Sequence, residues 1–469
     1  MFSFLVMFAL LAAALGYNQL IRGPELSRQA VAMRSKKIAL KEYPRGEILD
    51  RNLIPITSSR LSQAVYFLFT RETMQPQNMQ KAAAELSNAL GDLSRQQILA
   101  KLQEGQKNAS PFVRVAMDLT FGQAARINLC TARGLVMAPI SKRYGNDGFC
   151  AHLIGYISDQ DSFRGHAGLE KIYNDILQKP GPEKELVTVL DARGTAIHGL
   201  MFKIRQEQTR DQGQLILTID RRIQQIVENA VNDSMAQGAV IVMDIKTREI
   251  LAMASRPTFN QNDIAPALRD EENSPLINRA LNACHPGSLF KILLAAAALA
   301  ENKVTPEEQF LCQGHIEINP QVTINCWKEE GHGQISFTGA LANSCNPAFI
   351  AAGLKLGRSD LLKYARELEI TDTTIIGYPD NQLNSFIKID SGQAALANAS
   401  IGQQGVMLTP LQLTSLLATI ADDGWYKSPV LVKYTVDSRG SRKDLPQDER
   451  RRVLKTAAAR EVQTMMVEC

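Results

Sequence analysis

The segment from Ser288 to Ala300 constrains the fold of this chain more than any other part of it. After Lys291 the segment reads Ile-Leu-Leu-Ala-Ala-Ala-Ala-Leu-Ala, so a helix formed from it is apolar on nearly every side. A helix of that kind is stable in water only when other elements surround it. Because Pro286 and Gly287 end the irregular stretch before it, the sequence predicts a buried helix that begins at Ser288.

Ser288 and Lys291 lie one helical turn apart in this segment. Residues i and i+3 share one face of a helix, so the Lys291 amine can reach the Ser288 hydroxyl. An apolar setting lowers the pKa of a lysine, and the neutral amine can then act as a base toward the serine. The N–H groups at the start of a helix also favour developing negative charge. The pair therefore predicts a serine acyl-transfer site with Ser288 as nucleophile and Lys291 as base.

Ser344-Cys345-Asn346 is the only Ser-x-Asn tripeptide in the chain and supplies a second hydroxyl for the same chemistry. It follows a helical run from Phe337 to Asn343 and precedes Pro347, so we expect it in a loop between helices. There Ser344 can relay a proton to a leaving amine while Asn346 binds a substrate amide. The alternative is that both side chains only cap a helix.

A second Ser-x-x-Lys copy, Ser385-Phe386-Ile387-Lys388, shows that this spacing alone is not specific. The copy lies in an alternating stretch typical of a strand. In a strand, residues i and i+3 point to opposite faces of the sheet. We therefore interpret the second copy as structural.

The N-terminal residues 1–21 carry no charged side chain, and residues 2–15 are almost wholly apolar. Such a segment is either a membrane anchor or a secretory signal peptide, and both place the rest of the chain outside the cytoplasm. We favour an uncleaved transmembrane anchor, which predicts a single-pass protein of the cell membrane. The net charge of +4 is spread along the sequence, so no basic stripe for nucleic acid is indicated.

Two further sections follow the anchor. Residues 35–205 mix short strands with amphipathic helices and carry no catalytic pattern, which predicts a mixed α/β pedestal domain that binds a partner. Residues 214–469 begin with a strand and an amphipathic helix, followed by an apolar hairpin over 239–254 that would start a central antiparallel sheet. Helices predominate after the hairpin, so the predicted fold class is α+β.

Seven cysteines are too few for a disulfide framework in 469 residues, but an extracytoplasmic location permits individual bridges. Cys312 and Cys326 flank a stretch that predicts a hairpin and are the favoured disulfide pair. Two free thiols are the alternative. Cys284, Cys345 and Cys469 are expected to be unpaired, and no spacing resembles a zinc site.

Several further motifs stand in a fixed order along the chain, together with Ser288-x-x-Lys291 and the Ser-x-Asn tripeptide. They are Arg45-Gly46-Glu47-Ile48-Leu49-Asp50-Arg51, Gly168-Leu169-Glu170, Leu217-Thr218-Ile219-Asp220, Ala254-Ser255-Arg256-Pro257-Thr258-Phe259-Asn260 and Ile401-Gly402-Gln403-Gln404-Gly405, the last leading to Thr409-Pro410. In this the chain resembles the class B penicillin-binding proteins, the membrane-anchored D,D-transpeptidases that crosslink peptidoglycan. The resemblance covers nearly the whole sequence.

The resemblance implies how the site would work. Ser288 would attack the penultimate D-Ala carbonyl of a stem peptide, with Lys291 as base, and expel the terminal D-Ala. A second stem peptide's amine would then accept the acyl group, and β-lactams would acylate the same serine. The resemblance also implies a dimerisation-type pedestal, which allows a dimer. It implies a membrane glycan polymerase of the SEDS type as partner, a role in cell shape or cell division, and neither a metal nor an organic cofactor.

One departure from the family pattern concerns Lys-Thr-Gly, which would bind the substrate carboxylate and supply an oxyanion N–H. The tripeptide does not occur in the chain, and Lys455-Thr456-Ala457 is no substitute because it opens a predicted helix and lacks the glycine. We therefore expect a C-terminally incomplete transpeptidase domain that lacks its last strands, with impaired activity. The alternatives are a non-catalytic cell-wall scaffold that accompanies a glycan polymerase, and a β-lactam sensor or β-lactamase.

Overall fold

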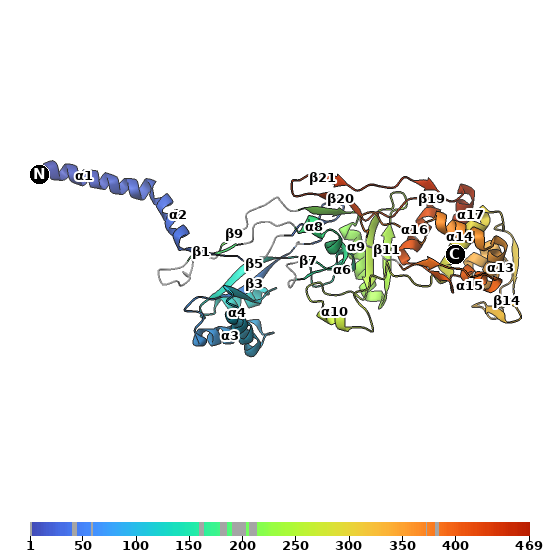
Figure 1. Cartoon of the computed structure of the whole chain (residues 1–469), viewed down its shortest axis with the longest axis horizontal. Helices are drawn as coiled ribbons and strands as arrows, with labels where there is room; N and C mark the ends of the chain where they lie inside the picture. Colours follow the sequence, from blue (N-terminus) through green and yellow to red (C-terminus); the bar gives the residue numbers. More distant parts are fainter. Residues whose placement is uncertain are drawn as a thin grey trace. The chain divides into compact units, whose positions relative to one another are not determined.

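The computed structural model describes residues 2–39, 45–57, 60–158, 164–178, 185–189, 203–205, 213–371, 373–379 and 384–469 (Figure 1). The chain forms two compact units. The first comprises Met1–Pro44, Ser58–Arg143 and Pro180–Thr209, and the second comprises Arg45–Thr57, Tyr144–Lys179 and Arg210–Cys469. Residues 206–212, where the sequence places the junction between the pedestal and the last domain, lie outside the described residues.

The first unit contains an antiparallel sheet in the order β4-β3-β5, formed by Phe112–Ala116, Arg60–Leu68 and Leu135–Lys142. Alternate side chains of β3 point to opposite faces of the sheet. Val65 and Phe67 pack with helices α3 (Pro76–Leu90), α4 (Arg95–Lys107) and α5 (Phe121–Asn128), whereas Ala64 and Tyr66 pack with β5 on the other face. A separate antiparallel sheet pairs β1 (Ser35–Ala39), β8 (Glu185–Val189) and β9 (Lys203–Arg205).

Two glycines near these helices behave differently. Gly91 follows α3 in the left-handed region, with φ +80°, and ends that helix. Gly105, by contrast, lies inside α4. A Cβ at position 105 would come within 2.1 Å of the Val113 side chain, so this glycine allows α4 to pack closely on the sheet.

An apolar helix precedes this unit's sheets. It comprises α1 (Phe2–Gly16) and a π-helical continuation, η1 (Tyr17–Ile21), and is followed by α2 (Gly23–Arg34). Phe2–Ile21 is long and apolar enough to cross a membrane, with a mean hydropathy of 1.9. That is a weak sign of a membrane anchor, because a signal peptide has the same properties.

The second unit brings together segments that are far apart in sequence. Strand β10 (Gln214–Leu217) pairs with β2 (Ile48–Leu49) in parallel and with β20 (Val432–Val436) in antiparallel fashion, and β21 (Arg442–Asp444) completes the sheet. Beside β2, Arg45 Nε donates to Glu170 Oε2 at 2.6 Å, and the Tyr144 hydroxyl donates to Glu170 Oε1 at 2.9 Å. The short elements of this region are α6 (Ala151–Ile154), β6 (Ile157–Ser158), β7 (Arg164–Gly165), α7 (Gly168–Ile172) and α8 (Asn174–Leu177).

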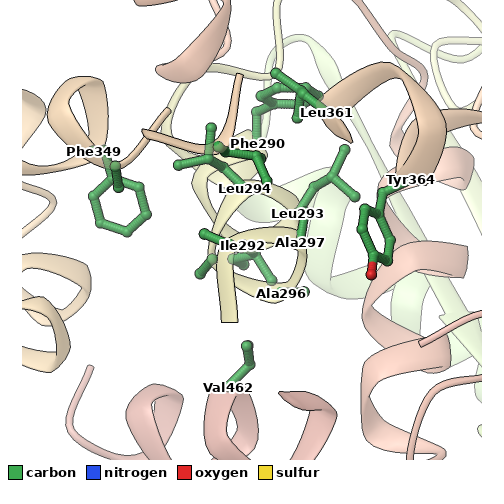
Figure 2. Close-up of a cluster of buried hydrophobic side chains, with 14 of the residues drawn as sticks. Phe290, Ile292, Leu293, Leu294, Ala296, Ala297, Phe349, Leu361, Tyr364 and Val462 are labelled. Atoms are coloured by element: carbon green, nitrogen blue, oxygen red, sulfur yellow. The ribbon is translucent and has the colours of Figure 1, made fainter. Parts of the chain in front are cut away.

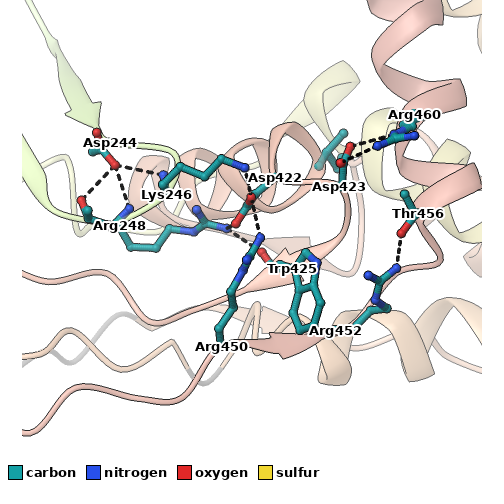
Figure 3. Close-up of polar contacts among 12 residues, drawn as sticks. Asp244, Lys246, Arg248, Asp422, Asp423, Trp425, Arg450, Arg452, Thr456 and Arg460 are labelled. Atoms are coloured by element: carbon teal, nitrogen blue, oxygen red, sulfur yellow. Dashed lines mark hydrogen bonds and ion pairs between the residues drawn. The ribbon is translucent and has the colours of Figure 1, made fainter.

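An antiparallel hairpin of β11 (Gly238–Met243) and β12 (Ile250–Arg256) forms the next layer, as the sequence predicts. Helix α9 (Arg221–Ser234) packs on β12, and α16 (Pro410–Ala421) contacts β11. The turn of the hairpin is fixed by charge, because Lys246, Arg248 and Arg450 surround the buried carboxylate of Asp422 just after α16 (Figure 3). The hairpin and the following helices are thereby joined.

The rest of the unit is mainly helical and surrounds α11 (Phe290–Ala300), every residue of which is buried. Helices α13 (Asn346–Leu356), α14 (Arg358–Glu367), α15 (Gln393–Ser400) and α17 (Thr456–Val467) all contact it. Figure 2 shows Phe349, Tyr364 and Val462 directed at α11 from three of them. The buried helix that the sequence predicts is confirmed.

Smaller elements complete the second unit. They are α10 (Ala265–Arg269), η3 (Gly287–Leu289), β13 (Gln309–Cys312), β14 (His315–Asn319), β15 (Val322–Asn325), β16 (Gly333–Ser336), α12 (Phe337–Ala342), β17 (Phe386–Ile387), β18 (Val406–Met407), β19 (Trp425–Tyr426) and β22 (Arg451–Arg452). Strands β14 and β15 form the hairpin predicted between Cys312 and Cys326. The overall class, α+β with an N-terminal apolar helix, agrees with the prediction.

Candidate active site

Ser288 lies in the 3₁₀ turn η3, immediately before α11, and its side chain is exposed. Gly287 precedes it with φ +56°, and the Gly287 N–H donates to the Gly402 carbonyl at 3.0 Å. A Cβ at Gly402 would lie 2.1 Å from the Gly287 oxygen, so only glycine permits this close backbone approach. The motif around Gly402 therefore supports the turn that presents Ser288.

Lys291 lies one turn further along α11 and is only 1% exposed. Its amine donates to the Ser344 carbonyl at 2.8 Å, to Ser344 Oγ at 3.0 Å and to Asn346 Oδ1 at 2.8 Å. Burial lowers the pKa of Lys291 from 10.5 to about 8, even though the thiols of Cys345 and Cys326 act in the opposite direction. A substantial neutral fraction is therefore present near physiological pH.

Ser344 occupies the left-handed region with φ +50°, at the turn between α12 and α13. Its hydroxyl donates to Ser288 Oγ at 2.8 Å and accepts from Lys291. The sequence predicted direct contact between Lys291 and Ser288. In the structure the hydroxyl of Ser344 lies between them, so a proton can pass from Ser288 to Lys291 through Ser344.

Asn346 begins α13 and faces the same group of side chains. Its Oδ1 accepts from Lys291, and its Nδ2 donates to the Asn325 carbonyl at 3.0 Å. The structure thus brings together all four residues that the sequence singles out. The predicted contact of Asn346 with a substrate amide stays a prediction.

The second Ser-x-x-Lys copy has different surroundings. Ser385 Oγ donates to the Thr371 carbonyl at 3.2 Å and accepts from Gln412 Nε2 at 2.7 Å. Lys388 follows β17, and its N–H donates to the Gly405 carbonyl. The first contact joins Ser385 to the Thr371 backbone and the second joins it to α16, in agreement with a structural role for this copy.

A thiol and imidazole cluster lies directly behind Ser344. Cys312 and Cys326, the favoured disulfide pair, are free thiols in the structure, so their bridge stays a prediction. Their donor atoms lie within 4.8 Å of those of His332 and Cys345. Sequence reasoning did not group these four residues, because their spacing matches no common zinc pattern and Cys345 was expected to be isolated. The sequence did contain one indication of a metal site, namely four potential metal ligands between residues 312 and 345.

The chemistry of the site follows from these contacts. An exposed hydroxyl at a helix start is joined through a second hydroxyl to a buried amine of lowered pKa, which is how serine nucleophiles are activated. Acyl transfer needs no further group to generate the nucleophile. The geometry is that of an acyl-transfer site.

Two family models match the chain. The one described as penicillin binding protein transpeptidase domain matches residues 238–469, which include all four site residues. The one described as penicillin-binding protein dimerisation domain matches residues 41–208.

Similar proteins include Stage V sporulation protein D of Bacillus subtilis (strain 168), which is 28% identical over 445 residues, covering 92% of this chain and 66% of that protein. Peptidoglycan D,D-transpeptidase MrdA of Escherichia coli (strain K12) is 25% identical over 467 residues, covering 90% of this chain and 71% of that protein. The chain thus spans about two thirds of the length of these curated relatives.

Solved structures show the same fold. A penicillin-binding protein (PBP2) from Helicobacter pylori superimposes with a TM-score of 0.66 at 22% identity, covering 92% of this chain and 85% of that one. Penicillin Binding Protein 2X from Streptococcus thermophilus gives a TM-score of 0.62 at 21% identity, covering 92% and 66%. By its paired dimerisation and transpeptidase domains, the chain belongs to the class B penicillin-binding proteins.

Proposed function

We propose that this protein is a peptidoglycan D,D-transpeptidase and that Ser288 is its nucleophile. The observation that carries the proposal is the hydrogen-bonded series from Lys291 through Ser344 to Ser288. It places a base of lowered pKa within one relay step of an exposed serine. The family relationship supports stem peptides that end in D-Ala-D-Ala as the substrate class.

In the first half-reaction, Ser288 Oγ attacks the penultimate D-Ala carbonyl. Its proton passes to Ser344 Oγ, and the proton of Ser344 passes to the neutral Lys291 amine. The tetrahedral intermediate then collapses, and the proton returns through Ser344 to the nitrogen of the departing D-Ala. The products are an acyl-enzyme on Ser288 and free D-Ala.

In the second half-reaction, an amine of another stem peptide attacks the ester carbonyl. Lys291 accepts a proton from that amine through Ser344, and Ser288 is regenerated by the reverse transfer. Asn346 would orient the amide of the bound peptide. A β-lactam would acylate Ser288 by the first half-reaction alone, since its ring amide replaces the D-Ala-D-Ala bond.

The proposal also includes the location and the partners of the protein. Phe2–Ile21 would anchor the chain in the cell membrane with its two folded units outside the cytoplasm. A SEDS-type glycan polymerase would supply the uncrosslinked strands.

The test is covalent labelling of the full chain with a fluorescent penicillin, with the labelled peptide identified by mass spectrometry. We expect one label, on Ser288, and no label on a Ser288→Ala variant. Ser385→Ala is the matched control, because it removes the serine of the structural Ser-x-x-Lys copy. Its labelling should equal that of the unmodified chain.

The outcomes separate the proposal from its alternatives. Release of D-Ala from a pentapeptide, together with stable labelling, supports the transpeptidase. Rapid release of hydrolysed penicillin would instead indicate a β-lactamase. A folded chain that takes no label at Ser288 at any penicillin concentration would contradict the proposal and favour the non-catalytic scaffold.

A further inference from the structure

Four metal-binding side chains converge behind the active-site turn. Cys312 ends β13, Cys326 follows β15, His332 lies just before β16, and Cys345 precedes α13. Their sulfur and nitrogen atoms all lie within 4.8 Å of one another. The three sulfurs are buried, with Cys345 at 0%, Cys312 at 1% and Cys326 at 5% exposure. Such a set is unusual for isolated thiols and is typical of a structural metal site.

Two of the separations equal those of neighbouring ligands around one tetrahedral ion. His332 Nδ1 lies 3.5 Å from Cys312 Sγ and 3.7 Å from Cys326 Sγ. Zinc bonds of about 2.3 Å to sulfur and about 2.0–2.1 Å to nitrogen place two tetrahedral ligands about 3.6 Å apart. Three thiolates and one imidazole are a donor set that favours zinc over magnesium or calcium.

Two glycines allow the backbone segments around the cluster to approach one another closely. A Cβ at Gly331 would lie 2.2 Å from the Cys312 oxygen, and a Cβ at Gly314 would lie 1.8 Å from the Glu329 oxygen. Both glycines have positive φ, at +79° and +88°. The Cys326 N–H also donates to the Gly314 carbonyl at 2.7 Å. These contacts bring the Cys312, Cys326 and His332 segments together.

We propose that Cys312, Cys326, His332 and Cys345 bind one zinc ion, and that the ion fixes the Ser344-Cys345-Asn346 turn. Binding displaces the three thiol protons and involves no change of oxidation state. The zinc has no open ligand position, so its role is structural. The four protein residues complete its coordination.

The connection to the catalytic turn runs through three contacts. Cys345 lies between Ser344 and Asn346, so a sulfur–zinc bond fixes the backbone of both. Cys326 follows Asn325, whose carbonyl accepts from Asn346. The His332 ring packs edge-on against Trp327 at 5.5 Å, and the Trp327 indole donates to the Asn343 carbonyl at 2.8 Å. The four cluster residues are therefore positioning residues, since none touches Ser288.

A Cys312–Cys326 disulfide would exclude the metal. It would consume two of the four ligands and leave Cys345 and His332 without a shared ion. The two states differ in metal content and in thiol count, so one set of measurements separates them.

The first experiment measures zinc in the full chain, purified in detergent without a metal-affinity tag, by inductively coupled plasma mass spectrometry. About one zinc per chain is expected for a single four-ligand site. Titration with a chromogenic chelator should release it only slowly. Substitution by Co²⁺ should give the intense sulfur-to-metal charge-transfer absorption of a thiolate site.

Two variants and a control make the assignment specific. His332→Ala should release zinc at much lower chelator concentration, whereas His332→Cys keeps four ligands and should retain the metal. Cys284→Ser is the control, because Cys284 is an exposed thiol of the same unit outside the cluster, and its zinc content should not change. A zinc-free chain with free thiols, or peptide mapping that finds a Cys312–Cys326 bridge, would overturn the proposal.

A second readout tests the positioning role and rests on the proposed function. Chelation, or His332→Ala, should slow penicillin labelling of Ser288 by tenfold or more, and restored Zn²⁺ should recover it only in the chain with four ligands. If zinc binds stoichiometrically but its removal leaves labelling unchanged, the positioning role is wrong while the metal site stands. If the chain never labels, the zinc measurement still decides the site.

Discussion

At the scale of single residues, the site depends on how the Lys291 amine uses its hydrogens. The ionised amine has three donors, and three oxygens of Ser344 and Asn346 accept them. The neutral amine has two hydrogens and one lone pair. Turning the lone pair to the Ser344 hydroxyl leaves a donor each for the Ser344 carbonyl and for Asn346. The Ser344 hydroxyl then donates to Lys291 and accepts from Ser288, so two hydrogen bonds reverse when the proton leaves, while the bonds to the Ser344 carbonyl and to Asn346 keep their direction.

The pH dependence of acylation follows from this residue. Lys291 must be neutral to accept a proton, and its pKa is lowered to about 8, chiefly by burial. The acylation rate should therefore rise roughly tenfold per pH unit below pH 7 and level off above about pH 9. Stopped-flow labelling with fluorescent penicillin across pH 6–10 measures this, corrected for hydrolysis without protein. A flat profile would show that Lys291 is not the base.

Sequence spacing predicted part of this arrangement. Ser288 in η3 and Lys291 in α11 lie three residues apart in one continuous helical segment, so their proximity follows from helical geometry alone. Ser344 is 56 residues away from Ser288, and its position between the two depends on how α13 packs on α11. No local pattern reports that packing. The zinc ligands escaped prediction for the same reason, since they come from separate elements.

At the scale of elements, the turn before α11 depends on a second loop. Gly402 has φ +69°, and its backbone lies against Gly287 and Phe290. A side chain there would meet a carbonyl oxygen, which cannot move without displacing the turn that carries Ser288. Loop and helix therefore act as one support for Ser288.

Gly402→Ala tests this support against a matched control. Gly440 also has positive φ, +79°, but a Cβ there meets nothing within 4 Å. Gly440→Ala should cost only the left-handed strain of about 1–2 kcal/mol in unfolding free energy. Gly402→Ala adds a steric clash, so it should destabilise more and slow penicillin labelling as well. Urea unfolding and labelling rates measure both, and equal effects of the two variants would contradict the argument.

Periodicity predicted most of these elements. The apolar run of α11 and the hairpin β11–β12 were identified from pattern alone, because burial leaves a strong signature in residue type. Gly105 shows what such patterns cannot predict. Glycine has a low helix propensity, but Gly105 lies inside α4 because a larger residue there would collide with the Val113 and Phe69 side chains. That constraint comes from tertiary packing.

At the scale of the whole molecule, the second unit is not one continuous stretch of sequence. Residues 45–57 and 144–179 belong to it together with the long C-terminal part. From chain order we predicted both segments to be part of the pedestal, and the dimerisation family model, which matches residues 41–208, includes them as well. The motifs at Arg45 and Glu170 were noted as separate features, and only the fold shows that they form one buried ion pair.

Arg45→Leu tests how much this pair stabilises the unit. The Arg45 and Glu170 side chains are 5% and 0% exposed, so the substitution removes a guanidinium that is in direct contact with a buried carboxylate. We expect a loss of about 3–5 kcal/mol in unfolding free energy. Arg442→Leu is the control, since its partner Asp444 and Arg442 itself are exposed, and should cost at most about 1 kcal/mol. Denaturant unfolding of both variants measures the difference, and comparable losses would contradict the buried-pair argument.

The Arg45–Glu170 pair also has a consequence for biosynthesis. Glu170 leaves the ribosome 125 residues after Arg45. At about 5–20 residues per second, Glu170 is synthesised roughly 6–25 s after Arg45, and the ion pair cannot form before then. Strand β2 pairs with β10, so this pairing must form later still, after β10 has been synthesised. The second unit therefore cannot assemble progressively from its amino end, because its first strand and the buried Arg45 need partners that are synthesised much later.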